Sequence, residues 1–90
     1  MPLKRNKRLV IKNFNRALIS CIEKHSQITL SATALANAFN LRADGTTTIS
    51  RQTARKWLTG ESIPEPGHLL VLVEWLKLDM NEVYKRTDDA

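Results

Sequence analysis

The sequence predicts a single domain built only from α-helices. Apolar residues recur three and four positions apart along several segments, a spacing that places them on one face of a helix. No segment alternates apolar and polar residues as a half-buried β-strand would. The chain has 90 residues, of which 42% are hydrophobic, and this is enough for one domain with one modest core.

The first helix is expected to begin between residues 6 and 13 and to end near residues 25–27. One apolar stripe supports it: Val10, Phe14, Ala17, Leu18, Cys21 and Ile22. The lysine- and arginine-rich residues 1–8 are expected to form a flexible basic arm. The domain itself is therefore expected at residues 9–86, and residues 87–90 are expected to be a frayed tail.

Ser31 and Ser50 are suitable N-caps for a second and a third helix, because a serine hydroxyl can accept a hydrogen bond from a backbone amide of the first turn. The second helix is short, and its expected apolar face contains Ala34, Leu35, Ala38 and Phe39. The third helix should run to about Thr59 and stop at Gly60, since glycine commonly follows the last helical residue. The polar residues 42–48 between the two helices predict a loop.

Two further helices are expected in the last third of the chain. Pro66 suits the first turn of a fourth helix that covers about residues 67–77. Its expected buried face consists of Leu69, Leu70, Leu72, Val73 and Leu76. Asp79, with Glu82 three residues later, has the spacing of a capping box and predicts a short fifth helix.

The whole chain has a net charge of +5, and its positive charge is concentrated in the first two-thirds of the sequence. Residues 1–30 hold seven lysines and arginines against one acid, and residues 31–60 hold four against one. Residues 61–90 reverse the sign, with three against seven. This asymmetry indicates a polyanionic partner on one side of the molecule. A merely solvated charged surface is the alternative interpretation.

Several other classes of protein are disfavoured. No apolar run is long enough for a transmembrane helix, and the apolar run at residues 9–11 is too short for a signal peptide, so we expect a cytoplasmic protein. Cys21 is the only cysteine, which rules out an internal disulfide. Cys21 and His25 are one turn apart, but His68 has no second ligand close to it in the sequence. We therefore expect no metal and no cofactor.

The third expected helix carries the most distinctive chemistry. At 100° per residue, the polar side chains of Arg51, Gln52, Arg55, Lys56 and Thr59 fall within an arc of about 140°. The apolar residues Ala54, Trp57 and Leu58 occupy the other side, and no acid stands between Ser50 and Gly60. Arginine and lysine donate hydrogen bonds to guanine, and glutamine pairs with adenine. This arc is therefore typical of a helix that reads base edges, although a solvated basic face has the same composition.

The segment from Ile49 to Gly60, with Pro64 after it, resembles the helix-turn-helix of phage repressors and Cro proteins, also called the xenobiotic-response-element family. Upstream, Leu35-Ala36 is similar to the core of that family's second helix. Downstream, residues 72–79 resemble its fourth helix and the cap of its fifth. The resemblance covers about residues 12–85 and implies a five-helix, lambda-repressor-like DNA-binding domain whose helix-turn-helix consists of helices 2 and 3.

The resemblance also implies roles for individual residues. The base-reading positions of the family fall on Arg51, Gln52 and Lys56, with Arg55 close by. Phosphate-binding positions fall on Ser50 and, at the start of the second helix, on Ser31 and Thr33. In the basic arm, the candidate phosphate contacts are Lys4, Arg5, Lys7 and Arg8, for which a solvated tail is the alternative.

Two features are left open by this resemblance. The family joins helices 2 and 3 by about three or four residues, whereas residues 41–49 form a longer connection here. Either the second helix continues past Arg42, or a small loop exposes Arg42 and Asp44. Trp57 matches a core position, but Trp75 can be a core residue or a dimer contact.

The sequence thus favours a sequence-specific regulator of transcription, with a repressor as the expected type. Its expected partner is double-stranded DNA carrying a palindromic operator, bound by a homodimer through the region around residues 75–85. A protein-interaction module, such as an antitoxin or a phage accessory protein, is the alternative. An enzyme is not expected, because no spacing resembles a nucleophile elbow, a phosphate-binding loop or a dinucleotide fingerprint.

Overall fold

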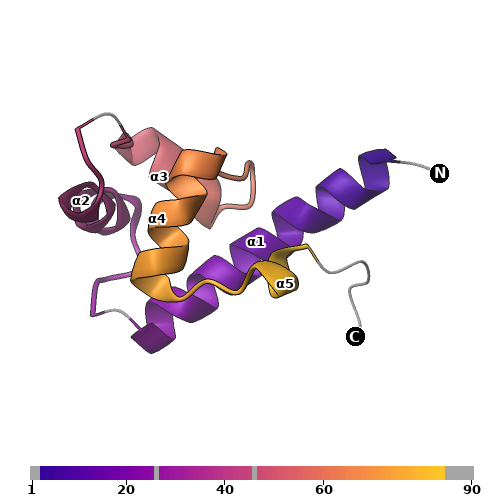
Figure 1. Cartoon of the computed structure of the whole chain (residues 1–90), viewed down its shortest axis with the longest axis horizontal. Coiled ribbons are helices and arrows are strands. Elements are labelled where there is room, and N and C mark those ends of the chain that lie inside the picture. Colours follow the sequence, from indigo (N-terminus) through magenta and orange to yellow (C-terminus); the bar gives the residue numbers. More distant parts are fainter. Residues whose placement is uncertain (1–2, 26, 46, 85–90) are drawn as a thin grey trace.

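The computed structural model describes residues 3–25, 27–45 and 47–84, with the side chains of residues 3–7 and 25 left out. Within these residues the structure is all-helical and contains no strand, as predicted. The five helices are α1 (Leu3–His25), α2 (Ala32–Arg42), α3 (Arg51–Leu58), α4 (Pro66–Leu76) and α5 (Met80–Val83). Figure 1 shows α2, α3 and α4 grouped around one half of the long helix α1, with α5 beside its middle.

The three predicted N-caps are confirmed. The hydroxyl of Ser31 accepts a hydrogen bond from the amide of Ala34 at 3.2 Å. The hydroxyl of Ser50 accepts one from the amide of Thr53 at 3.1 Å, and the carboxylate of Asp79 accepts one from Asn81 at 2.9 Å. Because these bonds are local, the residue type at the cap is enough to set where each helix begins.

Helix α1 begins earlier than expected, at Leu3, so that residues 3–8 continue the helix and do not form a separate arm. No glycine or proline occurs from Leu3 to Asp44, and lysine, arginine and leucine all favour the helix. A basic stretch of this composition can therefore extend a helix that later residues have already started. In Figure 1 this end of α1 projects beyond the other helices.

The core is organised around Trp57, whose side chain is 1% exposed. Its ring meets Phe14 of α1 edge to face at 6.2 Å between centroids and Phe39 of α2 at 5.6 Å. The other large, fully buried side chains come from all the remaining helices: Leu18, Ile22, Leu35, Leu72, Leu76 and Val83. The predicted structural role of Trp57 is confirmed.

One residue of the expected core of α4 is placed differently. Leu72 and Leu76 are buried and Leu69 and Val73 are half-buried, but Leu70 is 58% exposed. The prediction for Leu70 is wrong because two residues along a helix correspond to about 200° of rotation, which puts Leu70 on the face opposite Leu72. None of the helices within the described residues has the length and apolar character needed to cross a membrane.

Candidate nucleic-acid interface

Helix α3 has two chemically distinct faces. Ala54 and Trp57 are buried, while the polar side chains are exposed: Arg51, Gln52, Arg55 and Lys56 on the helix and Thr59 at its C-cap. The division agrees with the predicted helical wheel. No acidic residue lies within α3, so that its solvent face combines three cations with one amide. Such a face offers hydrogen-bond donors and positive charge over a single surface.

A groove of about 470 Å³ lies between the start of α2 and the exposed face of α3. Helices α2 and α3 pack against each other, and the lining residues come from the N-cap and first turn of α2 and from the first two turns of α3: Ser31, Ala32, Thr33, Arg51, Gln52 and Arg55. The structure therefore brings together five of the residues singled out in the sequence, two from the start of α2 and three from α3.

The groove has the chemistry of an anion site. The amides at the start of α2 carry the positive end of the helix dipole, and Arg51 and Arg55 add two full positive charges. Ser31 uses an oxygen lone pair for its cap bond, so accepting that bond does not consume its hydroxyl hydrogen. A phosphate placed here would meet amide, hydroxyl and guanidinium donors together.

Ser50 and Lys56 lie outside the lining of this groove. The hydroxyl of Ser50 accepts from the amide of Thr53 and donates to Thr53 Oγ1, both at 3.1 Å, so it is occupied within the first turn of α3. Lys56 is exposed one turn beyond Gln52. Lys56 therefore continues the basic face of α3 toward the C-terminal end of the helix, beyond the residues that line the groove.

The four cations expected in an arm belong to α1 instead. Arg8 is exposed, whereas the side chains of Lys4, Arg5 and Lys7 lie outside the described part of the structure. Figure 1 shows the N-terminal end of α1 and helix α2 at opposite ends of the molecule. The structure thus does not bring these four residues together with the groove between α2 and α3.

Asn15 of α1 fixes the C-terminal end of α3, a role that is not predicted from the sequence. Its side-chain nitrogen donates to the backbone carbonyl of Trp57 at 2.9 Å and to that of Leu58 at 2.8 Å. These carbonyls belong to the last turn of α3, where helix carbonyls lack intrahelical partners. An asparagine outside the apolar stripe of a helix is the only signal in the sequence, and it resembles an ordinary surface residue.

Asn40 of α2 fixes the other end of α3. Its amide donates to the carbonyl of Ile49 at 2.9 Å, and its carbonyl oxygen accepts from the amide of Ile49 at 2.8 Å. Ile49 is 8% exposed and directly precedes the N-cap Ser50. The connection between the helices therefore has a firm attachment just before α3 begins.

The long connection takes the second of the two conformations considered above. Helix α2 ends at Arg42, and both Arg42 and Asp44 are exposed. Thr47 turns back on Asp44, with its amide bonded to the Asp44 carbonyl at 3.1 Å and its hydroxyl to the Asp44 carboxylate at 3.2 Å. The extra residues thus form a surface loop and leave the packing of α2 on α3 intact.

An acidic residue marks the end of the basic face. The hydroxyl of Thr59 donates to the carboxylate of Glu61 at 2.7 Å, and the amide of Glu61 bonds to the carbonyl of Lys56 at 2.9 Å. Glu61 is thereby held just beyond the C-terminus of α3. Its charge limits the positive surface to the length of α3 on this side.

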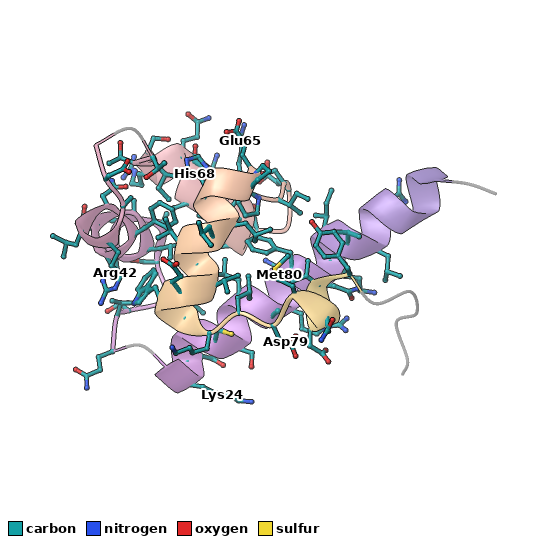
Figure 2. All side chains as sticks on the ribbon, in the orientation of Figure 1. Lys24, Arg42, Glu65, His68, Asp79 and Met80 are labelled. Atoms are coloured by element: carbon teal, nitrogen blue, oxygen red, sulfur yellow. The ribbon has the colours of Figure 1, made fainter. Side chains whose placement is uncertain are left out.

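Two further reactive side chains of the described residues, Cys21 and His68, lie outside this interface. Burial raises the pKa of the half-buried Cys21 thiol. The charge of Lys24 lowers this pKa and that of Asp79 raises it further; Figure 2 labels Lys24 beside α1 and Asp79 beside α5. A raised pKa keeps the thiol protonated and unreactive near neutral pH. His68 packs on the rings of Phe39 and Trp57 at 5.7 and 5.9 Å. Within the described residues, no three His, Cys, Asp or Glu side chains gather closely enough to hold a metal ion.

Comparison of the chain with protein-family models, with curated proteins and with solved structures found no match in any of the three. The candidate interface is accordingly defined by its own geometry: a basic helix face, a groove beside it that suits an anion, and two asparagines that hold the helix at both ends.

Proposed function

We propose that this protein is a sequence-specific DNA-binding regulator of transcription, of the repressor type, that reads the major groove with α3. The observation that carries the proposal is the groove in which the start of α2 meets the acid-free face of α3. One side of this groove suits phosphate and the other suits base edges. The two kinds of contact that a DNA-reading domain needs are thus adjacent.

The roles of the side chains follow from their chemistry. Arg51, Arg55 and Lys56 would donate to guanine O6 and N7, and Gln52 would pair with adenine N6 and N7. Ser31 and Thr33 would bind a phosphate at the edge of the major groove, aided by the amides of the first turn of α2. Ser50 would contribute to phosphate binding only after exchanging its hydrogen bond to Thr53.

We further propose that α2 and α3 are the helix-turn-helix of a lambda-repressor-like domain. Support comes from the order of five helices, the two serine N-caps and the buried Trp57. The longer connection between α2 and α3 departs from the short turn of that family. The paired hydrogen bonds between Asn40 and Ile49 compensate for it, because they fix α3 to α2 independently of the loop length.

A homodimer on a palindromic operator completes the proposal. A single α3 of eight residues can contact only a few base pairs, so useful specificity requires two copies. Two such helices would read half-sites separated by about 34 Å, one turn of the double helix. Dimer symmetry would then be matched by the symmetry of the operator.

The decisive experiment is selection of genomic DNA. The purified full chain is incubated with sheared genomic fragments, and the bound fragments are sequenced. We expect enrichment of a short inverted repeat. Retention of fragments without a shared sequence would show only charge-driven binding, and recovery of no DNA would contradict the proposed function.

A protein-interaction module, such as an antitoxin or a phage accessory protein, is the second candidate. It is favoured by four large apolar side chains that are exposed among the described residues: Leu41 at 84%, Leu70 at 58%, Tyr84 at 52% and Leu30 at 43%. This candidate does not explain why α3 lacks acids. This candidate would be supported if the chain bound a partner protein tightly and if variants of the exposed residues of α3 bound that partner equally well.

A further inference from the structure

A second groove, of about 260 Å³, lies at the other end of α2. It is lined by Arg42, the last residue of α2, and by Val71, Glu74 and Trp75 of α4. Figure 2 labels Arg42 close to α2 and α4. None of these four residues belongs to the candidate nucleic-acid interface, so the groove is a separate feature of the surface.

Arg42 is held in a fixed position in this groove. Its guanidinium carbon lies 4.5 Å from the centroid of the Trp75 ring, which is the geometry of a cation–π contact. One guanidinium nitrogen also donates to the carbonyl of Ala38 at 3.0 Å. Because two contacts already orient the side chain, little further conformational entropy would be lost when a partner binds it.

The groove is lined by two apolar side chains, Val71 and Trp75, and by two side chains of opposite charge. Val71 and Trp75 are half-buried, while Arg42 and Glu74 are exposed. Leu41 and Leu70, exposed by 84% and 58%, precede Arg42 and Val71 in the chain but are not among the residues that line the groove. Tryptophan and arginine are the residue types most enriched at the energetic centres of protein interfaces, and an apolar patch with a polar rim is typical of such surfaces.

We propose that this groove, formed by Arg42, Val71, Glu74 and Trp75, is the contact surface for a second copy of the chain. With Arg42 and Glu74 in its lining, this surface is complementary in charge to a second copy of itself. In a two-fold symmetric dimer the same surface of both copies forms the interface. If one residue of the first copy faces a second residue of the other copy, the symmetry makes the second residue of the first copy face the first residue of the other. Arg42 of each copy would then face Glu74 of the other copy, and the apolar side chains of Val71 and Trp75 would be buried between them.

The dimer would leave the candidate nucleic-acid interface open. The candidate interface includes the start of α2, whereas the groove lined by Arg42 lies at the end of α2. The two ends of this 11-residue helix are about 16 Å apart. This dimer surface rests on the homodimer of the proposed function, for which it supplies the contact residues. It is tested without DNA, so its failure is distinguishable from failure of DNA binding.

The test is an exchange of charges between two full-length variants, measured by sedimentation equilibrium. Arg42→Glu gives a chain with two acids in the groove, and Glu74→Arg gives a chain with two arginines. Each variant alone should dimerise about 10-fold or more weakly than the unmodified chain, because like charges then face each other. An equimolar mixture should form heterodimers with near-original affinity, since each pair of facing residues again has opposite charges.

The equimolar mixture shows whether the substitutions weaken dimerisation through contacts between two chains or through a change of structure within each chain. Each variant carries two like charges in its own groove, so contacts inside a chain cannot restore association. Lys24→Glu and Glu23→Arg, which make the same changes of charge at exposed positions of α1, should leave dimerisation unchanged. A chain that is monomeric at every concentration would overturn the proposal and leave the groove to another protein. A mixture that associates no better than the separate variants would also overturn it.

Discussion

Asn40 and Ile49 are joined by two hydrogen bonds that run in opposite directions between the side-chain amide of one and the backbone of the other. Asn40 lies in the last turn of α2, and Ile49 directly precedes the N-cap of α3. This pair ties the residue before the N-cap of α3 directly to the last turn of α2, across the connection between the two helices. A loop that is longer than a tight turn is thereby compatible with a precisely placed α3.

Asn40→Ala should lower the free energy of unfolding by about 1–3 kcal/mol, because it leaves the amide and carbonyl of Ile49 without their partner in a part-buried site. Urea denaturation of the variant gives the value. Asn37→Ala is the matched control, since Asn37 is an exposed asparagine of the same helix. Equal stability of the two variants would show that the Asn40–Ile49 pair contributes nothing.

Trp57→Ala should lower the free energy of unfolding by about 3–5 kcal/mol through the cavity that it leaves. The indole is 1% exposed and contacts Phe14 and Phe39, so the surrounding rings cannot close the space without moving. Trp57→Phe should cost less, because it keeps an aromatic ring in the same place. A Trp57→Ala chain with a normal Tm and lost DNA binding would instead mean that Trp57 contacts nucleic acid.

Gly60→Ala should destabilise the fold by about 1–2 kcal/mol, the usual cost of a left-handed backbone for a residue with a side chain. Gly60 has a φ of +76°, and an added Cβ would have only ordinary contacts with Asn15, the nearest at 3.7 Å. The expected loss therefore comes from the backbone and not from a clash. Gly45→Ala is the control: its Cβ meets nothing within 4 Å and its φ is not positive, so its Tm should be unchanged or slightly higher.

The basic N-terminal end of α1 gives a prediction about salt. Replacing Lys4, Arg5, Lys7 and Arg8 by glutamine keeps a residue type that favours the helix and removes four charges. If these side chains neutralise phosphates, the log–log slope of operator affinity against salt should flatten by about 2–4 units, because each contact releases about 0.9 counterion. Parallel salt lines for the variant and the unmodified chain would show that this end of α1 does not contact DNA.

The sequence predicted what depends on local chemistry. The serine and aspartate caps, the end of α3 before Gly60 and the burial of Trp57 follow from residue type and helical spacing, and the structure agrees. The contacts of Asn15 and Asn40 could not be predicted, because a polar residue in a helix gives no sign of a partner 42 or 9 positions away.

Two other differences have equally physical causes. A lysine- and arginine-rich stretch is compatible with a flexible arm and with a helix. In the structure this stretch is helical from Leu3 onward, because it continues α1 without a break. For the candidate interface, the composition of α3 was readable, but its meeting with Ser31 and Thr33 depends on how α2 packs against α3. Only the resemblance to phage repressors had suggested that meeting.

The proposal that the exposed face of α3 reads base pairs is tested most directly by the operator affinity of alanine variants at Arg51, Gln52, Arg55 and Lys56. Each variant that removes a base contact should lose about 1–3 kcal/mol of binding to the selected operator, with an unchanged Tm because all four side chains are exposed. Lys24→Ala, which removes an exposed cation of α1, is the control and should bind normally. Unmodified affinity in all four α3 variants would contradict the claim.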